Sequence, residues 1–262
     1  MKYDILESLI SASWQAGSYI CHYYESREFS VSEKNDSHDL VTNVDRESQR
    51  IIQEELSRRF PDIPIIGEED KNFFEKEHAF FIDPLDGTLN FVKQIPFFSV
   101  SIGYWKDNKP VCGVVYDPLR KEMFYARSGY GSYRNGKEIK ISKNQSNKYR
   151  VLASDWGHEP YYYQKNIEML QRLNKEKSYL FRFMGCASLA ICYVGAGILD
   201  GYWHYKLFPW DMAASVLIAQ EAGASVTLLD GKPFDLWKQN VLVVLPELKK
   251  EVISIAELEK GL

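Results

Sequence analysis

The sequence predicts a mixed α/β fold made of an α+β half followed by an α/β half. Residues 97–141 read as a continuous run of strands, whereas the chain beyond about residue 149 alternates between strands and helices. We therefore assign residues 1–145 to an N-terminal α+β half and residues 146–262 to a C-terminal α/β half. The polar stretch between them is too short to hold two domains apart, so we expect one compact unit.

Two amphipathic helices are expected near the N-terminus. From Tyr3 to about Glu25, apolar residues recur with the period of one buried helix face. A second periodic set, which ends at Pro61, predicts another helix. The polar segment 26–37 between them predicts a loop. The two periodic sets are Ile5, Leu6, Leu9, Ile10, Ala16, Ile20 and Tyr24, and Val44, Ile51, Ile52, Leu56 and Phe60.

Short apolar runs predict the strands. Residues 63–66 and 79–82 are bounded by Pro, Gly and acids, which is typical of strands. Hairpin turns at 106–110 and 134–137 indicate that residues 97–141 form an antiparallel meander. In the C-terminal half, strands are expected near 151–156, 179–184, 200–205, 225–230 and 241–246. Helices are expected at 161–173, 186–194, 212–222 and near the end of the chain.

The composition favours a small-molecule partner. A net charge of -4, with acids and bases mixed along the chain, gives no basic stripe of the kind that nucleic acid requires. No run of about 18 apolar residues is present to cross a membrane, and Lys2, Asp4 and Glu7 interrupt the stretch where a signal peptide needs an apolar core. A cytoplasmic location is therefore expected. The four scattered cysteines form no CxxC pair and are expected to be reduced core thiols.

The stretch FFIDPLDGTLNF, residues 80–91, places two carboxylates directly after an apolar run. No Lys or Arg between Lys76 and Lys93 neutralises Asp83 and Asp86. Taken alone, Asp-Gly also suits a simple turn in which Asp86 caps a helix. Three further acid clusters weaken that interpretation, because each lies at the end of an expected element: Gly67–Asp70, Asp39–Asp45 and Trp210–Ala214.

Convergence of Glu68, Asp83, Asp86 and Asp211 would carry a large electrostatic cost. At about 4 Å, each like-charged pair costs about 4 kcal/mol at an effective dielectric constant of about 20. Shared protons relieve such a cost in the carboxylate pair of a glycosidase, but four acids are more than that chemistry needs. A divalent cation is the better explanation. An all-oxygen ligand set without His or Cys favours Mg²⁺, with Mn²⁺ as the alternative, over zinc.

An acid cluster filled with cations suits the hydrolysis of phosphate esters. Bound ions invert the local field and so attract phosphate. One ion lowers the pKa of a bound water, and a second stabilises the leaving oxygen, so we expect two or three ions per site. Pro84 and Gly87 would let the Leu85 carbonyl turn towards the metal. The helical turn expected to open at Thr88 offers N–H groups to phosphate oxygens.

Four motifs of this chain resemble the signatures of the inositol monophosphatase family of Mg²⁺-dependent, lithium-sensitive phosphatases. They are DPLDGTLNF, WDMAAS, GEED and DLVTNVD, in the family's order and at its spacing, so that the resemblance covers essentially the whole chain. It implies a layered αβαβα sandwich, usually assembled as a homodimer. It also implies a phosphomonoesterase that acts on small phosphorylated metabolites.

The resemblance further implies roles for individual residues. Thr88 and Glu68 would position the attacking water, and Asp45 would support them by hydrogen bonding to Thr88. Lys34 matches a basic residue of a mobile loop near the active site, with a solvated surface lysine as the alternative. The implied metal ligands are Glu68, Asp83, the Leu85 carbonyl, Asp86 and Asp211. The implied substrate contacts are Asp86, Gly87, Thr88, Gly185, Cys186, Ala187, His204, Asp211 and Lys34.

One position departs from the family's pattern. Members that process inositol carry a Glu seven residues before the Asp of the second signature, and this chain has His204 there. If His204 faces the site, a group that donates hydrogen bonds and becomes cationic below about pH 6.5 replaces a carboxylate acceptor. Such a change favours a substrate with a second anionic group. Alternatively, the ring faces solvent or packs against Trp203.

Several functions are compatible with these motifs. Fructose-1,6-bisphosphatase, 3′-phosphoadenosine 5′-phosphate phosphatase and NADP(H) 2′-phosphatase share this kind of metal site. The aromatic residues of 156–163 would suit a stacked base, although adjacent tyrosines more often serve helix packing. A non-catalytic metal-binding regulatory protein is the alternative of another class. Thr88 and Glu68 argue against it, because a structural cage needs no group to orient a water.

Overall fold

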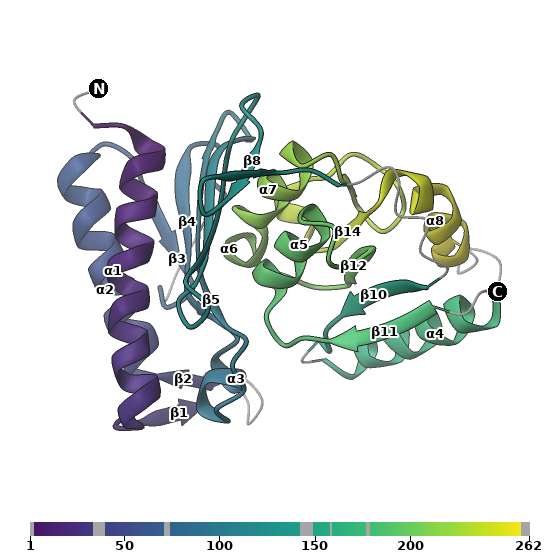
Figure 1. Ribbon diagram of the computed structural model, residues 1–262, viewed down its shortest axis with the longest axis horizontal. Helices are drawn as coiled ribbons and strands as arrows, with labels where there is room; N and C mark the ends of the chain where they lie inside the picture. Colours follow the sequence, from purple (N-terminus) through teal and green to yellow (C-terminus); the bar gives the residue numbers. More distant parts are fainter. Residues whose placement is uncertain are drawn as a thin grey trace.

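The computed structural model describes residues 3–33, 40–70, 74–141, 149–157, 159–176 and 179–257, and its elements form five alternating layers (Figure 1). Helices α1 (Ile5–Ser26) and α2 (Asn43–Arg59) form an outer layer beside a larger sheet. A central helical layer separates this sheet from a smaller one, and α4 and α8 cover the far face of the smaller sheet. The expected αβαβα sandwich is therefore confirmed.

The larger sheet has seven strands in the order β3-β4-β5-β6-β7-β8-β9. Its first two strands pair in parallel and its later neighbours pair antiparallel, so the predicted meander is confirmed. The predicted turn at 134–137 joins the last two strands. The strands are β3 (Ile65–Gly67), β4 (Ala79–Asp86), β5 (Ser99–Lys106), β6 (Lys109–Asp117), β7 (Glu122–Arg127), β8 (Ser132–Arg134) and β9 (Lys137–Ile139).

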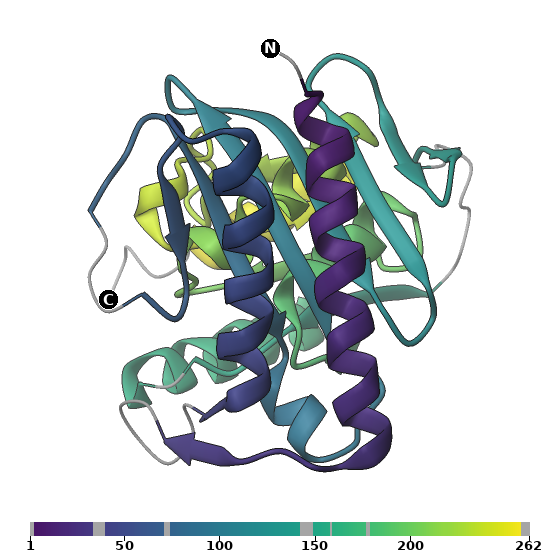
Figure 2. The same cartoon turned by 90° about the vertical axis from the view of Figure 1, so that its left-hand side faces the viewer.

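Helices α1 and α2 lie side by side across one face of the larger sheet (Figure 2). Asp4 caps α1 by accepting the Glu7 amide at 3.1 Å, and Thr42 forms a capping box with Asp45 at the start of α2. The predicted apolar face of each helix is the buried one. It packs on β4, β5 and β6 and includes Leu9, Ala16, Ile20, Val44, Ile52 and Leu56.

A two-stranded antiparallel sheet lies where the sequence predicted only a loop between these helices. It pairs β1 (Val31–Glu33) with β2 (Leu40–Thr42), and residues 34–39 lie outside the described residues. The Ser30 amide donates to the Asn43 side chain at 2.7 Å and ties the two ends of the segment together. Strands this short contain too few residues to establish a period, which is why the sequence pattern did not predict them.

The smaller sheet has five strands in the order β11-β10-β12-β14-β13. β10 pairs in parallel with β11 and β12, while β14 pairs antiparallel with β12 and β13. The predicted alternation of strands and helices is confirmed. The strands are β10 (Arg150–Ser154), β11 (Tyr179–Phe183), β12 (Gly201–His204), β13 (Ser225–Thr227) and β14 (Val241–Val244). The helices of this half are α4 (Pro160–Glu176), α5 (Ala187–Gly195), α6 (Pro209–Met212), α7 (Ser215–Glu221) and α8 (Lys249–Glu257), with the 3₁₀ helices η1 (Leu236–Lys238) and η2 (Pro246–Leu248). The short helix α3 (Thr88–Val92) belongs to the N-terminal half.

The helix predicted at 212–222 is instead divided into α6 and α7. The junction between them packs directly on the larger sheet: a Cβ atom built on Gly103 would lie 2.7 Å from Ala213, and one built on Gly113 would lie 2.6 Å from the Ala214 carbonyl oxygen. Because only a hydrogen atom fits beneath the junction, these glycines allow the C-terminal half to dock closely on the N-terminal half. This docking brings the start of α6 next to β4 and β5.

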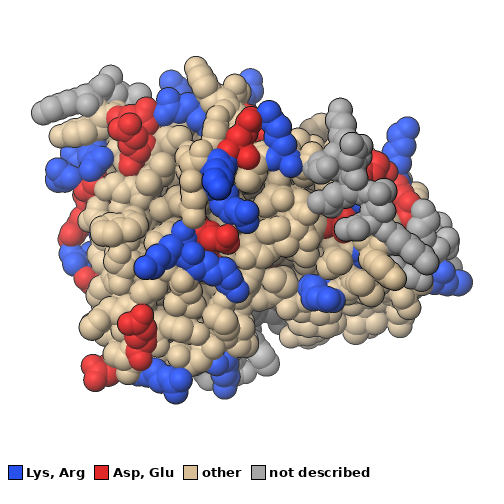
Figure 3. Space-filling model, viewed as in Figure 1, with Lys and Arg blue, Asp and Glu red and all other residues tan. Residues whose placement is uncertain are grey.

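The surface and the thiols agree with the composition. Acidic and basic side chains are interspersed on the face shown in Figure 3. The four cysteines are free, and Cys112, Cys186 and Cys192 are buried. Among the described helices, none combines the length and apolar character needed to cross a membrane.

Candidate active site

Strand β4 carries the two central acids, rather than ending before them as the sequence predicted. Asp83 pairs with Ser101 of β5 and Asp86 with Ser99, and the register shifts between these two pairs. Pro84 lies in the shifted segment, and it has no N–H group to donate to a neighbouring strand. The Leu85 amide donates to Asp83 Oδ1 at 3.1 Å. The irregular strand end thus holds both carboxylates at one place on the sheet.

Asp83 lies at the centre of a group of four acids. Its side chain is buried, with a relative exposure of 2%. Burial raises the pKa of Asp83 well above its ordinary value, and the negative charges of Glu68, Asp86 and Asp211 raise it further. Asp83 also hydrogen-bonds to the Glu68 side chain. The structure therefore brings together the four acids that the sequence analysis grouped.

The parallel pairing of β3 and β4 explains the position of Glu68. Gly67 pairs with Ile82, and the Glu68 amide donates to the Ile82 carbonyl at 3.0 Å, so Glu68 lies beside Asp83. Asp70 of the same motif has a structural role, because its Oδ2 atom accepts the Gly67 amide at 2.7 Å.

Asp86 is bound by backbone donors from the C-terminal half. Its two oxygens accept the amides of Ala187 at 3.3 Å and Ser188 at 2.7 Å, at the start of α5. Burial raises the pKa of Asp86, and the hydrogen bonds from Ser188 offset part of this effect. Gly87 follows in a left-handed conformation with φ of 92°, and a Cβ atom there would lie 2.9 Å from the Gly185 carbonyl oxygen.

Asp211 belongs to the first turn of α6. Its Oδ2 atom accepts the Phe208 amide at 2.7 Å, which orients the carboxylate at the helix N-terminus. The close packing of the α6–α7 junction on the larger sheet brings this carboxylate near Asp83, whose pKa it raises. A motif 128 residues further along the chain than Asp83 thus completes the acid group.

Buried Asp45 and half-buried Thr88 form a hydrogen-bonded pair beside the acids. Thr88 Oγ1 lies 2.8 Å from Asp45 Oδ1 and 3.0 Å from the Leu85 carbonyl oxygen, so its single hydrogen is shared between these two acceptors. Burial raises the pKa of Asp45 to about 6, with a smaller upward effect from Glu68 and opposing hydrogen bonds from Thr42 and Thr88. The structure thus contains the Asp45–Thr88 contact that the resemblance implies.

The donor set suits a hard divalent cation. It consists of carboxylate oxygens and one carbonyl oxygen, and Asp83 at its centre is buried among like charges. Within the described chain, no three His, Cys, Asp or Glu side chains are already arranged as ligands around one point. The negative charges of Glu68, Asp86 and Asp211 disfavour the charged form of Asp83, and a divalent cation bound among them would offset this repulsion. The type of donor atom that these residues offer therefore suits Mg²⁺.

The implied substrate contacts differ in how far the structure supports them. Gly185, Cys186 and Ala187 lead into α5, next to Asp86 and Gly87. Burial raises the pKa of the Cys186 thiol well above its ordinary value, so this residue is a protonated core thiol. Lys34 lies outside the described residues.

His204 is a buried residue of β12, with a relative exposure of 4%. Of the two alternatives to a site-facing ring, exposure to solvent is therefore wrong. The ring is nearly parallel to Tyr202, at 6.5 Å between centroids. Its Nδ1 atom accepts the Lys206 amide at 3.0 Å, so in the neutral ring the hydrogen is on Nε2.

The sequence analysis did not identify several residues that support the site. Asn90 and Ser188 hydrogen-bond across the two halves, and Asp155 accepts backbone amides next to the start of α5. A signal for Asp155 was present, because it comes after the short apolar run 151–153, much as Asp83 follows residues 79–82. No sequence signal marks Ser188, because its backbone amide and its hydroxyl reach Asp86 only in the folded chain.

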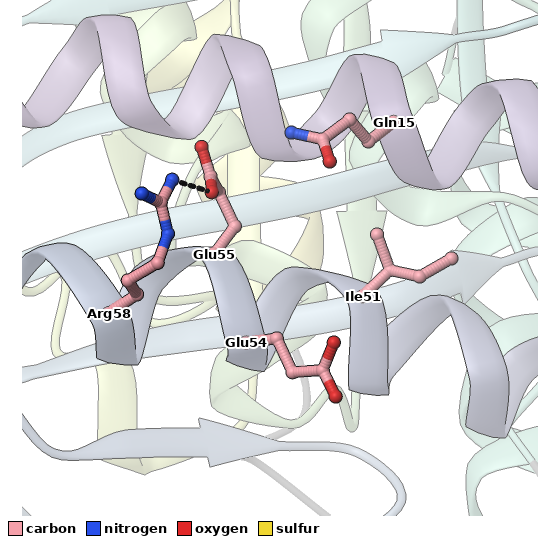
Figure 4. Close-up of a pocket in the computed structure, with 5 residues that line it drawn as sticks. All are labelled: Gln15, Ile51, Glu54, Glu55 and Arg58. Carbon is pink, nitrogen blue, oxygen red and sulfur yellow. Dashed lines mark hydrogen bonds and ion pairs between the residues drawn. The ribbon is translucent and has the colours of Figure 1, made fainter.

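A separate groove of about 280 Å³ lies between α1 and α2 and is lined by Gln15, Ile51, Glu54, Glu55 and Arg58 (Figure 4). Arg58 forms an ion pair with Glu55 there, at 2.6 Å. The groove lies on the outer helical layer and includes none of the acids of β4, so it is not part of the candidate active site.

Comparison with known proteins identifies the family. A sequence model of the inositol monophosphatase family matches residues 2–260. The chain belongs to this family. A Thermotoga maritima protein named fructose-1,6-bisphosphatase/inositol-1-monophosphatase is 36% identical over 226 residues, which cover 86% of this chain and 85% of that protein. The Vibrio cholerae protein named Nus factor SuhB is 34% identical over 254 residues, which cover 96% of this chain and 95% of that protein.

A solved structure gives the same result for the fold. An IMPase from Thermotoga maritima superposes with a TM-score of 0.88 at 32% identity, and the match covers 98% of this chain and 99% of that chain. The inositol monophosphatase family is metal-dependent and generally uses Mg²⁺. This member of it is a phosphoric monoester hydrolase with a small-molecule substrate.

Proposed function

We propose that Glu68, Asp83, the Leu85 carbonyl, Asp86 and Asp211 hold the Mg²⁺ ions with which this enzyme hydrolyses small phosphate monoesters. The burial of Asp83 among three other acids carries the proposal, because this arrangement is costly unless protons or cations neutralise it. Two or three ions per site suit this number of ligands, and Mn²⁺ has the same preference for oxygen.

Thr88, Glu68 and Asp45 would orient the attacking water. The bound metal supplies Lewis acidity that lowers the pKa of a water at neutral pH. Since the Thr88 hydrogen is already directed to Asp45 or the Leu85 carbonyl, the Thr88 oxygen is left to accept a hydrogen from that water. The Glu68 carboxylate would take the other hydrogen. As the water oxygen bonds to phosphorus, the ester P–O bond breaks and the leaving oxygen takes up a proton, giving inorganic phosphate and an alcohol.

The substrate would carry a second acceptor group next to the scissile phosphate. We propose that Asp211, Gly87 and the metal ligands contact the phosphate. The proposed contacts to the leaving group are Gly185, Cys186, Ala187 and His204. Lys34 is a further candidate for a substrate contact. The donor nitrogen of His204 replaces a carboxylate that would accept polyol hydroxyls. This substitution favours fructose 1,6-bisphosphate, 3′-phosphoadenosine 5′-phosphate or NADP⁺ over inositol monophosphate.

The test is a panel of phosphate-release assays with and without Mg²⁺. We expect release to depend on Mg²⁺ and to be faster with at least one of the substrates that carry a second anionic group than with inositol monophosphate. Preference for inositol monophosphate would contradict the role given to His204. Release that persists in the presence of a chelator would contradict the metal site.

A non-catalytic regulatory role is the second candidate, because relatives such as the Vibrio cholerae protein are named as a Nus factor rather than as a phosphatase. The Asp45–Thr88 contact argues for catalysis, since a cage that only binds ions has no use for a water-orienting hydroxyl. Mg²⁺ binding without turnover of any ester in the panel would favour the regulatory role.

We further propose that the chain forms a cytoplasmic homodimer and that residues 1–145 and 146–262 fold as one unit. The sheet-edge strand β11 and its surroundings expose apolar side chains that a second copy would cover, namely Trp156, Tyr163, Ile167, Leu180 and Phe183. Light scattering should give the mass of a dimer for the native chain and of a monomer for Phe183→Glu. Trp14→Glu, which changes an exposed Trp of α1, is the matched control and should stay dimeric. Thermal unfolding should show a single transition.

A further inference from the structure

Asp155 is a carboxylate with no role in the proposed reaction, yet three donors converge on it. It directly follows β10, and its Oδ1 atom accepts the backbone amides of Met184 at 2.8 Å and Gly185 at 2.6 Å. Its Oδ2 atom accepts the hydroxyl of buried Tyr202 at 3.1 Å. The Asp155 carboxylate therefore binds the turn between β11 and α5 to two central strands of the smaller sheet.

Asn90 of α3 binds the carbonyl groups of the same turn. Asn90 Nδ2 lies 2.9 Å from the Met184 carbonyl oxygen and 3.3 Å from that of Gly185, and it also donates to Phe97 at 2.7 Å. The amides of the turn are thus bound by the C-terminal half and its carbonyls by the N-terminal half. With both kinds of backbone group satisfied, the turn has one favoured position between the two halves.

This turn determines where the donors to Asp86 lie. The amides of Ala187 and Ser188, which bind the two oxygens of Asp86, follow Gly185 directly at the start of α5. The Gly185 carbonyl oxygen is also close to Gly87, where a Cβ atom would lie 2.9 Å away. A displacement of the turn would therefore move both the donors to Asp86 and the backbone that follows Asp86.

We propose that Asp155 is a positioning residue: by fixing the Met184–Gly185 turn, it keeps the amides of α5 on Asp86 and so orients this carboxylate for the divalent cation. The inference rests on the proposed metal site. Asp155 touches neither the substrate nor the ion, and its effect passes through backbone hydrogen bonds. Residues that hold the groups next to metal ligands typically change metal affinity or activity by about 10- to 100-fold when they are removed.

The positioning of the turn would depend on the acceptor oxygens of Asp155 more than on its charge. Desolvation raises the pKa of Asp155 to about 7, and the charge of Asp86 adds to this effect while the amides of the turn and the Tyr202 hydroxyl oppose it. The group therefore changes protonation near neutral pH, but Oδ1 accepts the two amides in either form. Asp155→Asn keeps this oxygen and can offer its NH₂ group to the Tyr202 oxygen, whereas Asp155→Ala removes every acceptor.

Glu221 provides a matched control. Its carboxylate also accepts two backbone amides of a glycine-containing turn, from Gly129 at 2.8 Å and Gly131 at 2.9 Å. It lies at the end of α7 and binds the turn between β7 and β8, so Glu221→Ala removes the same kind of hydrogen bonds from a turn that does not lead to Asp86.

The experiment measures Mn²⁺ binding by electron paramagnetic resonance and, separately, the Mg²⁺ concentration that gives half-maximal activity. For Asp155→Ala, we expect Mn²⁺ affinity to fall by about 10- to 100-fold and the required Mg²⁺ concentration to rise in parallel. The Mn²⁺ affinity of Asp155→Asn should stay within about threefold of that of the native chain. Glu221→Ala should lose thermal stability without losing Mn²⁺ affinity.

Three results would overturn the inference: native Mn²⁺ affinity in Asp155→Ala, an Asp155→Asn variant as weak as Asp155→Ala, or an equal loss in Glu221→Ala. If Asp155→Ala does not fold, Asp155→Ser takes its place in the same comparison. Failure of the proposed function is distinguishable, because it would appear as an inactive native chain whose Mn²⁺ affinity still depends on Asp155.

Discussion

Asp83 and Asp155 resemble each other in the sequence, since each comes after a short apolar run, but the two sheets surround them differently. Asp83, at the end of the larger sheet, faces three other acids. Asp155, at the end of the smaller sheet, faces two backbone amides and a tyrosine hydroxyl. In both cases desolvation raises the pKa of the carboxyl group. The partners, rather than burial itself, therefore separate a group suited to bind cations from one suited to hold a turn.

The same contrast distinguishes the two halves of the molecule. The N-terminal half contributes side-chain carboxylates from β4 and its neighbours, and these face one another in spite of their charge. The C-terminal half contributes Asp211, but otherwise backbone amides at the start of α5. Charge is concentrated on one side of the site and hydrogen-bond donors on the other. The following variants test this division.

Asp86→Asn should have the largest effect. It removes one charge and one of the two acceptor oxygens that bind Ala187 and Ser188, but it keeps the size of the side chain, so the fold should remain intact. We expect turnover to fall by about 10⁴-fold or more, because metal activation contributes several kcal/mol to such reactions. Phosphate release and circular dichroism measure the two quantities. Asp200→Asn, which changes a carboxylate paired with Arg150 at 2.8 Å, is the control and should retain activity. Turnover of Asp86→Asn near the native rate would refute the assignment.

Thr88→Ala should cause the second largest loss of activity. Loss of the hydroxyl removes the acceptor for the attacking water, and such groups typically contribute about 10²- to 10⁴-fold to the rate. Thr88→Ser keeps the hydroxyl next to Asp45 and should recover most of the activity. The measurement is kcat at saturating Mg²⁺, with Mn²⁺ binding as a second readout that should stay near the native value. Equal losses in the Ala and Ser variants would show that the methyl group, not the hydroxyl, matters.

His204→Glu should change selectivity more than rate. It replaces the donor nitrogen by a carboxylate acceptor, so kcat/KM for inositol monophosphate should rise relative to that for the substrates with a second anionic group. A shift of about 10- to 100-fold is expected for one exchanged hydrogen-bonding group. His22→Glu, on the outer helix α1, adds the same charge at an exposed position and should leave the ratio unchanged. An unchanged ratio in His204→Glu would exclude this residue from the substrate site.

The last prediction concerns the pH dependence of stability and not the activity. The pKa of Asp155 is about 7 in the folded chain, against an ordinary value of 3.8, so the folded state binds more protons than the unfolded state between these values. Stability contributed by this group is therefore lost as pH rises from about 4 to 7, by at most about 4 kcal/mol, and is constant above pH 7. Asp155→Asn lacks this dependence. The unfolding temperature of Asp155→Asn, relative to that of the native chain, should therefore rise from pH 4 to pH 7. A difference between the two chains that stays constant over this range would contradict the raised pKa of Asp155.

The sequence by itself determined the helices of the N-terminal half, the antiparallel meander, the alternation that follows it and the four acid motifs. These features depend on local patterns: a helix face recurs within a few residues, and an acid after an apolar run is visible wherever it occurs. The family resemblance followed from the same motifs, and the match over residues 2–260 shows that the family assignment is right.

Only the tertiary structure decided which acids face one another and which face donors. The contacts that distinguish Asp86 from Asp155 join residues 102 and 30 positions apart, and their donors are backbone amides that every residue except proline carries. The tautomer of His204 and the division between α6 and α7 likewise depend on neighbours that lie close only in the folded chain. Residue type shows what a side chain is able to do, whereas the partners that the fold places around it determine which of those roles it takes.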